Sequence, residues 1–427
     1  MSSLSPLTLP GVPETLLAEL VRAAAPDRLA LVGGAVRDLL LHRVHNDPWR
    51  GLPDLDLVVE GTAQAPGDVA PAQRLARRLL QALGPQRLVR CQEHGSFGTV
   101  ELELRLDTGD LLLDVASARQ ESYAQPGANP QVRFGSLAAD LARRDFTINA
   151  MALHLETGAG PTPSLALLDP HDGQGDLARR QLRFLHPASL RDDPSRILRG
   201  ARYAARLGFS LAPEAAAQLE TTLAAWPWPW RPGDPPELAP PALGTRLRME
   251  LELLLERENW RTALAALQRW RALPLLDGAL QADRQWRRRL HWAERLELPR
   301  PAALVIAAAD PLALAERLQL PQRWRRLLTE TLALRQQLMD AQLPTTAAPS
   351  QWAALLEGPG TSAAAVALLL AWGQGPRRPL LRWWLRWRHL GSEVSAAELI
   401  ASGVPPGPGL GERLRQLRAE RLDRQRI

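Results

Sequence analysis

The hydrophobic pattern of the first third of the chain predicts strands that alternate with helices. Between residues 28 and 155, short apolar runs are bounded by turn-forming residues, and four of these runs have the composition of strands: LALVGG (29–34), DLDLVVEG (54–61), GTVELEL (98–104) and DLLLDVAS (110–117). Two segments, VRDLLL and PAQRLARRLLQAL, instead repeat their apolar residues at helical spacing. This alternation is typical of an α/β fold.

The pattern changes at about residue 176, where the strand signals fade and arginine-rich amphipathic segments predict helices. The segment WPWPWRPGDPPELAPP (226–241) is too rich in proline for either regular structure, so it predicts a loop. The segment LPTTAAPS (343–350) separates a last helical region, which closes with the turn-rich VPPGPGLG (404–411) and an arginine-dense helix. We therefore expect an α/β part followed by an all-α part.

Composition changes this picture in one respect. All 52 of the Lys+Arg residues in the 427-residue chain are arginine, and the formal net charge is +6. Because arginine keeps its proton below about pH 12, this modest charge goes with a pI near 10.7. A compositional bias of the genome explains the absence of lysine, but guanidinium groups match phosphate well, so a polyanionic partner is also compatible with it.

Several classes of protein are disfavoured. Cys91 is the only cysteine, which argues against a disulfide framework and a zinc cluster. The first residues lack the basic and apolar regions of a secretory signal. The longest apolar run, residues 363–372, is too short to span a bilayer. We expect a cytoplasmic protein without a membrane segment.

Two acidic residues, Asp54 and Asp56, lie in an otherwise apolar strand. Side chains of a strand alternate between its faces, so these two point the same way, about 6.6 Å apart at about 3.3 Å per residue. Two neighbouring carboxylates repel each other and are costly to desolvate unless a positive group lies between them. The pair therefore suits a hard divalent cation that also binds substrate phosphates.

A glycine pair and a third acid add to this site. Gly33 and Gly34 lie where a strand passes into a helix, with Arg37 in the first helical turn, and such a turn lets phosphate approach the backbone. The pattern is neither G-x-G-x-x-G nor G-x-x-x-x-G-K-[ST], which disfavours a dinucleotide-dependent oxidoreductase and a P-loop. Asp114 lies in another strand-like run. It is either a third ligand of a two-metal site or an acid at a strand end that faces water.

Two later segments carry polar residues in unusual places. ADLARRDFTINAMAL (139–153) predicts a helix, but its apolar residues form no clean stripe. The polar residues are Arg143, Arg144, Asp145 and Asn149. We therefore expect some of these groups to be partly buried, with a nucleotide as their partner.

In the second segment, LRDDPSRILRGARYAARLGF (190–209), Asp192 and Asp193 precede Pro194, which is a typical start of a helix. Three arginines follow at three-residue steps on one side of this helix: Arg196, Arg199 and Arg202. A solvated arginine face explains this row. Alternatively, Asp193 and Arg196, one turn apart, offer an acceptor and donors that can pair with the edge of a base.

Five motifs in this order resemble the class II tRNA nucleotidyltransferase and bacterial poly(A) polymerase family: VGGAVRD, DLDLVVEG, RRDFTINAMA, DPHDGQGDL and DDPSRILRGARYAARLGF. The resemblance is strong over residues 29–210, and residues 398–423 also look like the end of family members. It implies an α/β nucleotidyltransferase head like that of DNA polymerase β, with a mixed sheet and helices, followed by an all-α neck, body and tail. The implied domains are the catalytic head (1–155), the neck with a nucleotide-template helix (156–225), a Pro/Trp-rich loop (226–245), the helical body (246–343) and a helical tail that binds tRNA (344–427).

The resemblance also implies roles for these residues. Asp54 and Asp56 would bind Mg²⁺ in a two-metal mechanism and activate the primer 3′-hydroxyl for attack on the α-phosphate of ATP or CTP. Asp114 is the superfamily-level choice for the third catalytic acid. Gly33, Gly34 and Arg37 would hold the triphosphate. Arg144, Asp145 and Asn149 would contact the nucleotide, with Asp145 facing the ribose. Asp193 and Arg196 would pair with the base edge, and Arg199 and Arg202 would continue that site. Gly173 and Asp176 match a flexible hinge.

This sequence departs from the family pattern at two places. The template motif usually begins Glu-Asp, whereas here it is Asp192-Asp193, which leaves Asp193 and Arg196 in place. A longer link, HNDPWRG (45–51), separates the glycine turn from the acids.

The implied activity is Mg²⁺-dependent addition of C and A residues to the tRNA 3′ end, although family members add CCA, only CC, only A, or poly(A). The segment between Tyr123 and Leu137 does not distinguish among these. A non-catalytic RNA-binding scaffold predicts loss of an acid or of the template pair, and both are present. Arginine and tryptophan recur together in the helical part, and we expect most of the 14 tryptophans to pack in cores while the helical body and tail bind tRNA.

Overall fold

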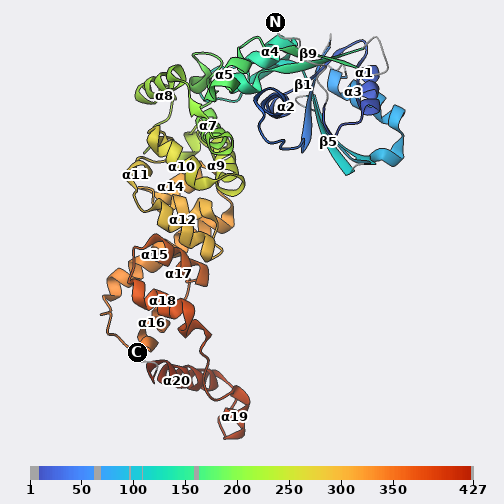
Figure 1. Cartoon of the computed structure of the whole chain (residues 1–427). Coiled ribbons are helices and arrows are strands. Elements are labelled where there is room, and N and C mark those ends of the chain that lie inside the picture. The colour runs from blue at the N-terminus through green and yellow to red at the C-terminus, as the bar shows by residue number, and fades with distance from the viewer. Residues whose placement is uncertain (1–8, 62–68, 96–97, 108, 158–162, 425–427) are drawn as a thin grey trace. The chain divides into compact units, whose positions relative to one another are not determined.

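The computed structural model describes residues 9–61, 69–95, 98–107, 109–157 and 163–424 (Figure 1). The chain divides into two compact units, Met1–Pro229 with Pro240–Ala242 and Trp230–Ala239 with Leu243–Ile427. The first unit holds all the named strands and the second is built of helices. The finer division into head, neck, loop, body and tail stays a prediction.

A seven-stranded mixed sheet forms the centre of the first unit, in the order β3-β4-β5-β2-β1-β8-β9. Its strands are β1 (Arg28–Val32), β2 (Asp54–Glu60), β3 (Leu88–His94), β4 (Thr99–Leu106), β5 (Gly109–Ser117), β8 (Ala152–Glu156) and β9 (Ser164–Leu168). Strands β2 and β5 are parallel, and the other neighbours are antiparallel. The four strands predicted from the hydrophobic pattern are confirmed, whereas the pattern did not predict β3, β8 and β9.

Helices cover both faces of this sheet, as the alternation of buried residues requires. Helices α1 (Glu14–Ala24) and α3 (Pro71–Leu83) contact each other, and α3 also contacts β2, β4 and β5. On the other face, Val58 of β2 packs in a cluster with Leu137 and Leu141 of α4 (Leu137–Ala142). Asp54 and Asp56 lie four and two positions before Val58 on β2. Because strand side chains alternate between the two faces, their side chains lie on the α4 face with that of Val58.

The helix predicted over residues 139–153 is wrong. Helix α4 ends at Ala142, a 3₁₀ turn η2 spans Thr147–Asn149, and β8 begins at Ala152. One interaction with a neighbouring residue and one with a distant residue explain the break. The Asp145 carboxylate accepts a hydrogen bond from the backbone N–H of Phe146 at 2.7 Å, which competes with helical pairing. Phe146 then forms an isolated bridge with Phe184 and packs on its ring.

The remaining elements of the first unit follow the sheet in the chain, apart from one hairpin and one 3₁₀ turn. They are η1 (Pro85–Arg87), the hairpin β6 (Arg119–Ser122) and β7 (Gln131–Phe134), α5 (Gly173–Arg179), β10 (Gln181–Leu182), α6 (Ser189–Asp192), α7 (Ser195–Leu207), β11 (Ser210–Leu211) and α8 (Pro213–Ala225). The predicted helices after residue 176 are confirmed, with the two-residue strands β10 and β11 as additions. The predicted helix VRDLLL lies within α2 (Gly34–His45).

The second unit is helical throughout its named elements, apart from short 3₁₀ turns. These are η3 (Pro236–Leu238), α9 (Thr245–Arg257), α10 (Trp260–Arg269), η4 (Leu273–Leu275), α11 (Gly278–Ala282), α12 (Trp286–Arg295), α13 (Arg300–Val305), α14 (Pro311–Arg317), α15 (Gln322–Ala341), α16 (Pro349–Leu356), α17 (Ala363–Trp372), α18 (Arg377–Leu385), η5 (Trp387–His389), α19 (Ala396–Ala401) and α20 (Pro408–Arg424). The break predicted at 343–350 falls between α15 and α16. In the part of the chain that the structure describes, no helix has both the length and the apolar composition to cross a membrane.

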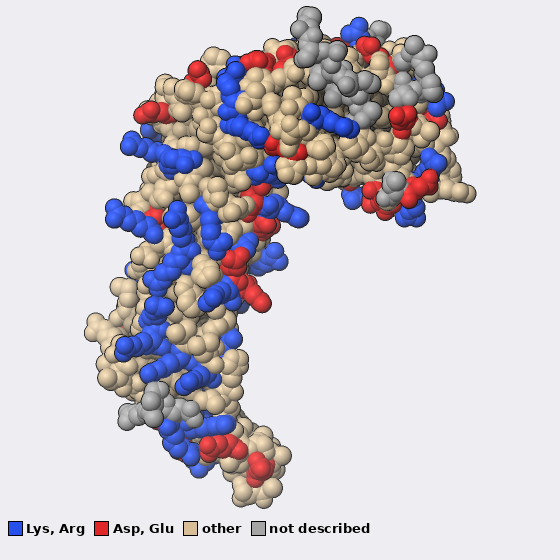
Figure 2. All heavy atoms as spheres, viewed as in Figure 1, with Lys and Arg blue, Asp and Glu red and all other residues tan. Residues whose placement is uncertain are grey.

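Most tryptophans pack in hydrophobic cores, as expected. All 14 lie in described residues, none of them is exposed, and Trp352, Trp383 and Trp387 share one core cluster of the second unit. Arginine instead populates the surface of this unit, where basic side chains cover much of the face shown in Figure 2. Such a surface is compatible with a polyanionic partner.

Candidate active site

Three carboxylates converge on the α4 face of the sheet. Asp54 and Asp56 lie on β2, and the parallel register of β2 and β5 places Asp114 directly beside Asp56. One oxygen of each carboxylate lies within 4.8 Å of the others, and all three residues are half-buried. This is the arrangement that the sequence predicted for Asp54 and Asp56, and the structure brings Asp114 into the same group.

The electrostatics of the triad favour a cation. Burial, followed by the charge of Asp54, raises the pKa of Asp56 to about 6. Burial and the same neighbour also raise the pKa of Asp114. Both shifts arise first from the cost of burying a charged carboxylate and second from repulsion by the neighbouring acid. A donor set made only of carboxylate oxygens fits a hard divalent ion such as Mg²⁺.

The glycine turn lies against the triad. Gly33 has a φ of +71°, and a Cβ atom there would lie 2.9 Å from Oδ2 of Asp56 and 3.3 Å from Nη1 of Arg144. Only glycine fits this position, both for its backbone conformation and for its closeness to the acid. Helix α2 starts at the next residue, so the free N–H groups of its first turn lie beside the carboxylates.

A chain of buried hydrogen bonds connects the predicted nucleotide-binding residues. Nη1 of Arg37 donates to Oδ1 of Asn149 at 2.9 Å, and Nδ2 of Asn149 donates to Oδ1 of Asp145 at 3.0 Å. The other oxygen of Asp145 pairs with Nη1 of Arg199 on α7 at 3.5 Å. The structure thus joins residues that are 162 positions apart in the sequence, from Arg37 to Arg199, in one network.

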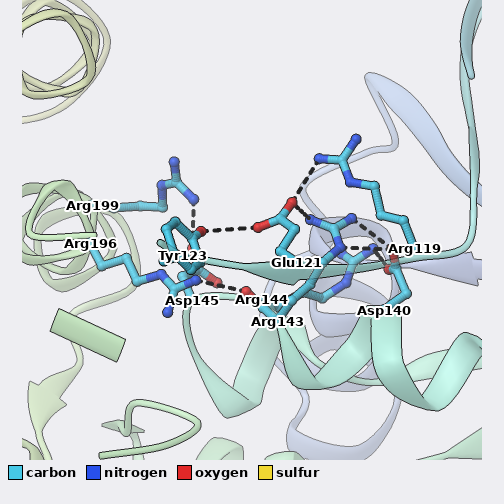
Figure 3. Close-up of polar contacts among 9 residues, drawn as sticks. All are labelled: Arg119, Glu121, Tyr123, Asp140, Arg143, Arg144, Asp145, Arg196 and Arg199. Atoms are coloured by element: carbon cyan, nitrogen blue, oxygen red, sulfur yellow. Dashed lines mark hydrogen bonds and ion pairs between the residues drawn. The ribbon is translucent and has the colours of Figure 1, made fainter. Parts of the chain in front are cut away.

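Arg144 belongs to a second network beside the first. It donates to Asp140 at 2.9 Å, and Arg143 donates to the other oxygen of Asp140 at 2.7 Å (Figure 3). Burial alone would raise the pKa of Asp140, but the two guanidinium groups outweigh burial and hold this pKa below its usual value. Asp140 therefore fixes both arginines while staying ionised.

The predicted template pair is held at the start of α7. Oδ1 of Asp193 accepts hydrogen bonds from the backbone N–H and the hydroxyl of Ser195, at 3.0 and 2.6 Å. Helix α7 begins at Ser195, directly after Asp193 and Pro194, so the predicted helix start is confirmed. Nη2 of Arg196 donates to the backbone carbonyl of Arg143 at 2.7 Å, which orients its side chain toward the Arg143–Arg144 turn (Figure 3). Arg202 follows Arg199 on the same helix.

The predicted hinge residues lie on α5, apart from the carboxylate triad. Asp176 is buried and accepts hydrogen bonds from Thr147 Oγ1 at 2.6 Å and from Nε of Arg183 at 2.8 Å. A Cβ atom at Gly173 would lie 2.5 Å from the carbonyl oxygen of Thr147, so glycine is required there. These contacts attach α5 to the turn that follows Asp145. The hinge motion itself stays a prediction.

Four residues of the site were not predicted from the sequence: Glu121, Tyr123, Asp140 and Tyr203. Asp140 and Tyr203 contact the predicted residues directly, the latter with its ring 5.4 Å from the Arg37 guanidinium carbon. The carboxylate of Glu121 accepts from the Tyr123 hydroxyl and from Arg143, both at 3.0 Å (Figure 3). Only Tyr203 had a signal in the pattern, because it lies one helical turn after Arg199 on the same face.

Comparison with known proteins gives a consistent assignment. A family model described as "Poly A polymerase head domain" matches residues 29–183. The CC-adding tRNA nucleotidyltransferase of Deinococcus radiodurans is 37% identical over 329 residues, which are 74% of this chain and 74% of that protein. The A-adding tRNA nucleotidyltransferase of Halalkalibacterium halodurans is 41% identical over 198 residues, 45% of this chain and 40% of that protein.

A solved structure of a CCA-adding enzyme in an apo form is 25% identical, with a TM-score of 0.68, and the match covers 96% of this chain and 91% of that one. The match to the D. radiodurans enzyme extends well beyond the head into the helical part. The five sequence motifs, the mixed sheet followed by helices, and these similarities agree. This chain belongs to the class II tRNA nucleotidyltransferase and bacterial poly(A) polymerase family.

Proposed function

We propose that this protein is a Mg²⁺-dependent nucleotidyltransferase that adds C and/or A residues to the tRNA 3′ end, using CTP and ATP. The observation that carries the proposal is the carboxylate triad beside the glycine turn. Such an arrangement suits a divalent cation and a phosphate group side by side. A cytoplasmic location belongs to the same proposal.

Asp54 and Asp56 hold the metal in this proposal, and Asp114 completes the acidic cluster. When bound, Mg²⁺ neutralises charge at the α-phosphate and lowers the pKa of the primer 3′-hydroxyl. The attack of that hydroxyl forms the O3′–P bond and releases pyrophosphate. The N–H groups at the start of α2 and the nearby guanidinium of Arg37 bind the triphosphate.

The nucleoside lies on the network that joins Arg37 to Arg199 in this proposal. Arg144 and Asn149 contact the nucleotide, and Asp145 faces the ribose. Asp193 and Arg196 pair with the base edge, and Arg199 and Arg202 extend that contact along α7. Support comes from the burial of Asp145, Asp193 and Arg196, since charged residues at such sites need strong partners. Gly173 and Asp176 serve as the hinge of the template.

Among the activities of the family, we favour tRNA end addition over poly(A) synthesis. The relatives described above are tRNA nucleotidyltransferases. We further infer that the enzyme stops at CC, because the D. radiodurans relative, which is matched over three quarters of this chain, is CC-adding. The RNA-binding scaffold has no support from the site, since all three acids are present and converge.

Substitution of the triad tests the proposal. Asp54→Ala is expected to abolish nucleotide addition to a tRNA that lacks its CCA end, because the metal loses a ligand and the attacking hydroxyl is not activated. Asp110→Ala, an exposed acid at the start of the same strand as Asp114, is the matched control and should keep wild-type activity. Binding of the same tRNA is measured alongside. Equal activity of Asp54→Ala and wild type would contradict a catalytic role, and equal binding without any activity in the wild type would favour the scaffold.

A further inference from the structure

The link after α2, which is longer than the family pattern, is folded tightly onto that helix. Asn46 closes α2 in the left-handed conformation, and the backbone N–H of Asp47 donates to the carbonyl of Leu41 at 3.0 Å. The ring of Trp49 packs on His42, whose Nδ1 lies 2.9 Å from the carbonyl oxygen of Asp47. The link is therefore an extension of α2 with a defined shape.

The same link reaches two elements that lie far away in the sequence. Nη1 and Nη2 of Arg180, at the end of α5, donate to the two carboxylate oxygens of Asp47 at 2.7 and 2.5 Å. The hydrogen bonds from Arg180 hold the pKa of Asp47 below its usual value. Nη1 of Arg50 donates to the backbone carbonyl of Arg206, in the last turn of α7, at 3.3 Å.

Arg180 also contacts the chain that leaves α7. Its guanidinium carbon lies 5.6 Å from the centre of the Phe209 ring, and its carbonyl accepts from the backbone N–H of Ser210 at 3.2 Å. One arginine therefore joins the α2 extension to the end of α7.

The backbone of Arg180 has an unusual conformation for a residue with a side chain. Its φ is +57°, in the left-handed region where glycine is favoured and other residues are strained. The position follows directly after α5, where glycine is the common choice for ending a helix. An arginine occupies this position against its backbone preference, and its bidentate pair with Asp47 offsets part of the strain.

We propose that Asp47 and Arg50, together with Arg180, form a brace between α2 and α7 that sets nucleotide discrimination. Helix α2 begins at the phosphate-binding turn, and α7 carries the base-contacting residues Arg196 and Arg199. The brace joins the C-terminal ends of these two helices, so it fixes how far the base edge lies from the triphosphate. This inference rests on the proposed function.

Two variants break the brace in different ways. Asp47→Asn removes the charge of the ion pair and nearly keeps its shape. Arg180→Gly removes the whole side chain but relieves the backbone strain, so its thermal stability should stay at or above the wild-type value. The matched control is Asp27→Asn, which breaks the Asp27–Arg74 pair of similar burial away from α7. The double variant Asp47→Arg with Arg180→Asp restores the ion pair in reverse.

The readout is the ratio of kcat/KM for CTP to that for ATP in single-nucleotide addition to a tRNA lacking CCA. Both brace variants should change this ratio toward one by about two- to fivefold, the range that corresponds to the loss of one partly exposed ion pair. The kcat for the preferred nucleotide should stay within about twofold, because the acids and Arg37 are untouched. The control and the charge-reversed double variant should discriminate as the wild type does.

Amide hydrogen exchange provides a second readout that needs no activity. Exchange in the last turns of α7 should be faster in Asp47→Asn and unchanged in the control. A wild-type enzyme that adds nucleotides, with brace variants that keep its discrimination and its exchange rates in α7, would overturn the brace. If the wild type adds no nucleotide to any tRNA, the proposed function fails instead, and the exchange experiment still decides whether the brace exists.

Discussion

Replacing Asp56 by asparagine should stabilise the metal-free protein while removing a ligand of the proposed metal site. The pKa of Asp56 is raised from 3.8 to about 6 by burial and by Asp54. Ionising this carboxyl therefore costs the folded state about 3 kcal/mol more than it costs the unfolded chain. Asparagine is close in shape and carries no charge, so Asp56→Asn should recover up to about that amount at neutral pH.

The sign of the effect fixes its pH dependence. Because the pKa of Asp56 is raised in the folded state, the contribution of this carboxyl to wild-type stability falls as pH rises from about 4 to about 6 and is constant above that range. The advantage of Asp56→Asn should therefore be largest above about pH 7 and shrink steadily toward about pH 4. Mg²⁺ should reverse the order, since it stabilises only the protein that binds it.

Equilibrium urea unfolding at a series of pH values, with EDTA or with Mg²⁺, measures these differences. The variant Asp110→Asn is the control, because its carboxyl is exposed and lies outside the triad. An Asp56→Asn protein that is no more stable than the wild type at neutral pH in EDTA would refute a cost of ionising Asp56. An advantage that does not decrease on acidification would refute it as well, because ionisation of the buried Asp56 carboxyl beside Asp54 is then not the cause.

Three further predictions follow from the same contacts. Gly33→Ala should lower kcat by at least about tenfold, since its Cβ would press on Asp56 and Arg144 and the residue is strained at φ +71°; single-turnover addition measures this, and wild-type kcat would contradict it. Asp140→Asn should cost about 3 kcal/mol at neutral pH, because two half-buried arginines lose their buried carboxylate partner. As the pKa of Asp140 is lowered in the folded state, this loss should shrink only below about pH 4 in urea unfolding, and a loss independent of pH would argue against the ion pairs. Asp145→Ala should reduce the preference for CTP over dCTP in competition assays, whereas an unchanged preference would remove Asp145 from the ribose site.

The sequence alone predicts the strands that carry the acids, because a half-buried strand imposes alternation on its residues. Asp54 and Asp56 are predictable as a pair for this reason. The proximity of Asp114 is different, since it depends on the parallel pairing of β2 with β5, two strands separated in the chain by α3, β3 and β4. No periodicity in the chain encodes that register.

The segment after α4 shows a second kind of limit. Its apolar composition resembles a helix, yet the hydrogen bond from the Phe146 N–H to the Asp145 side chain and the packing of Phe146 on Phe184 redirect the backbone. The second of these interactions involves a partner 38 residues away, so local propensity is overridden in part by tertiary contact. The unusual burial of Asp145 and Asn149 was predicted correctly, because the absence of an apolar stripe is itself a local signal.

Nucleotide addition to defined tRNA ends tests the central claim most directly. Purified protein with Mg²⁺ is given three synthetic tRNAs, which end before the CCA, after CC and after the final A, with CTP and ATP supplied singly and together. We predict that the first tRNA gains two C residues, that no addition occurs without Mg²⁺, and that Asp54→Ala is inactive. Addition of CCA would keep the enzyme class and correct its specificity. A wild-type protein that extends none of the three tRNAs would contradict the account.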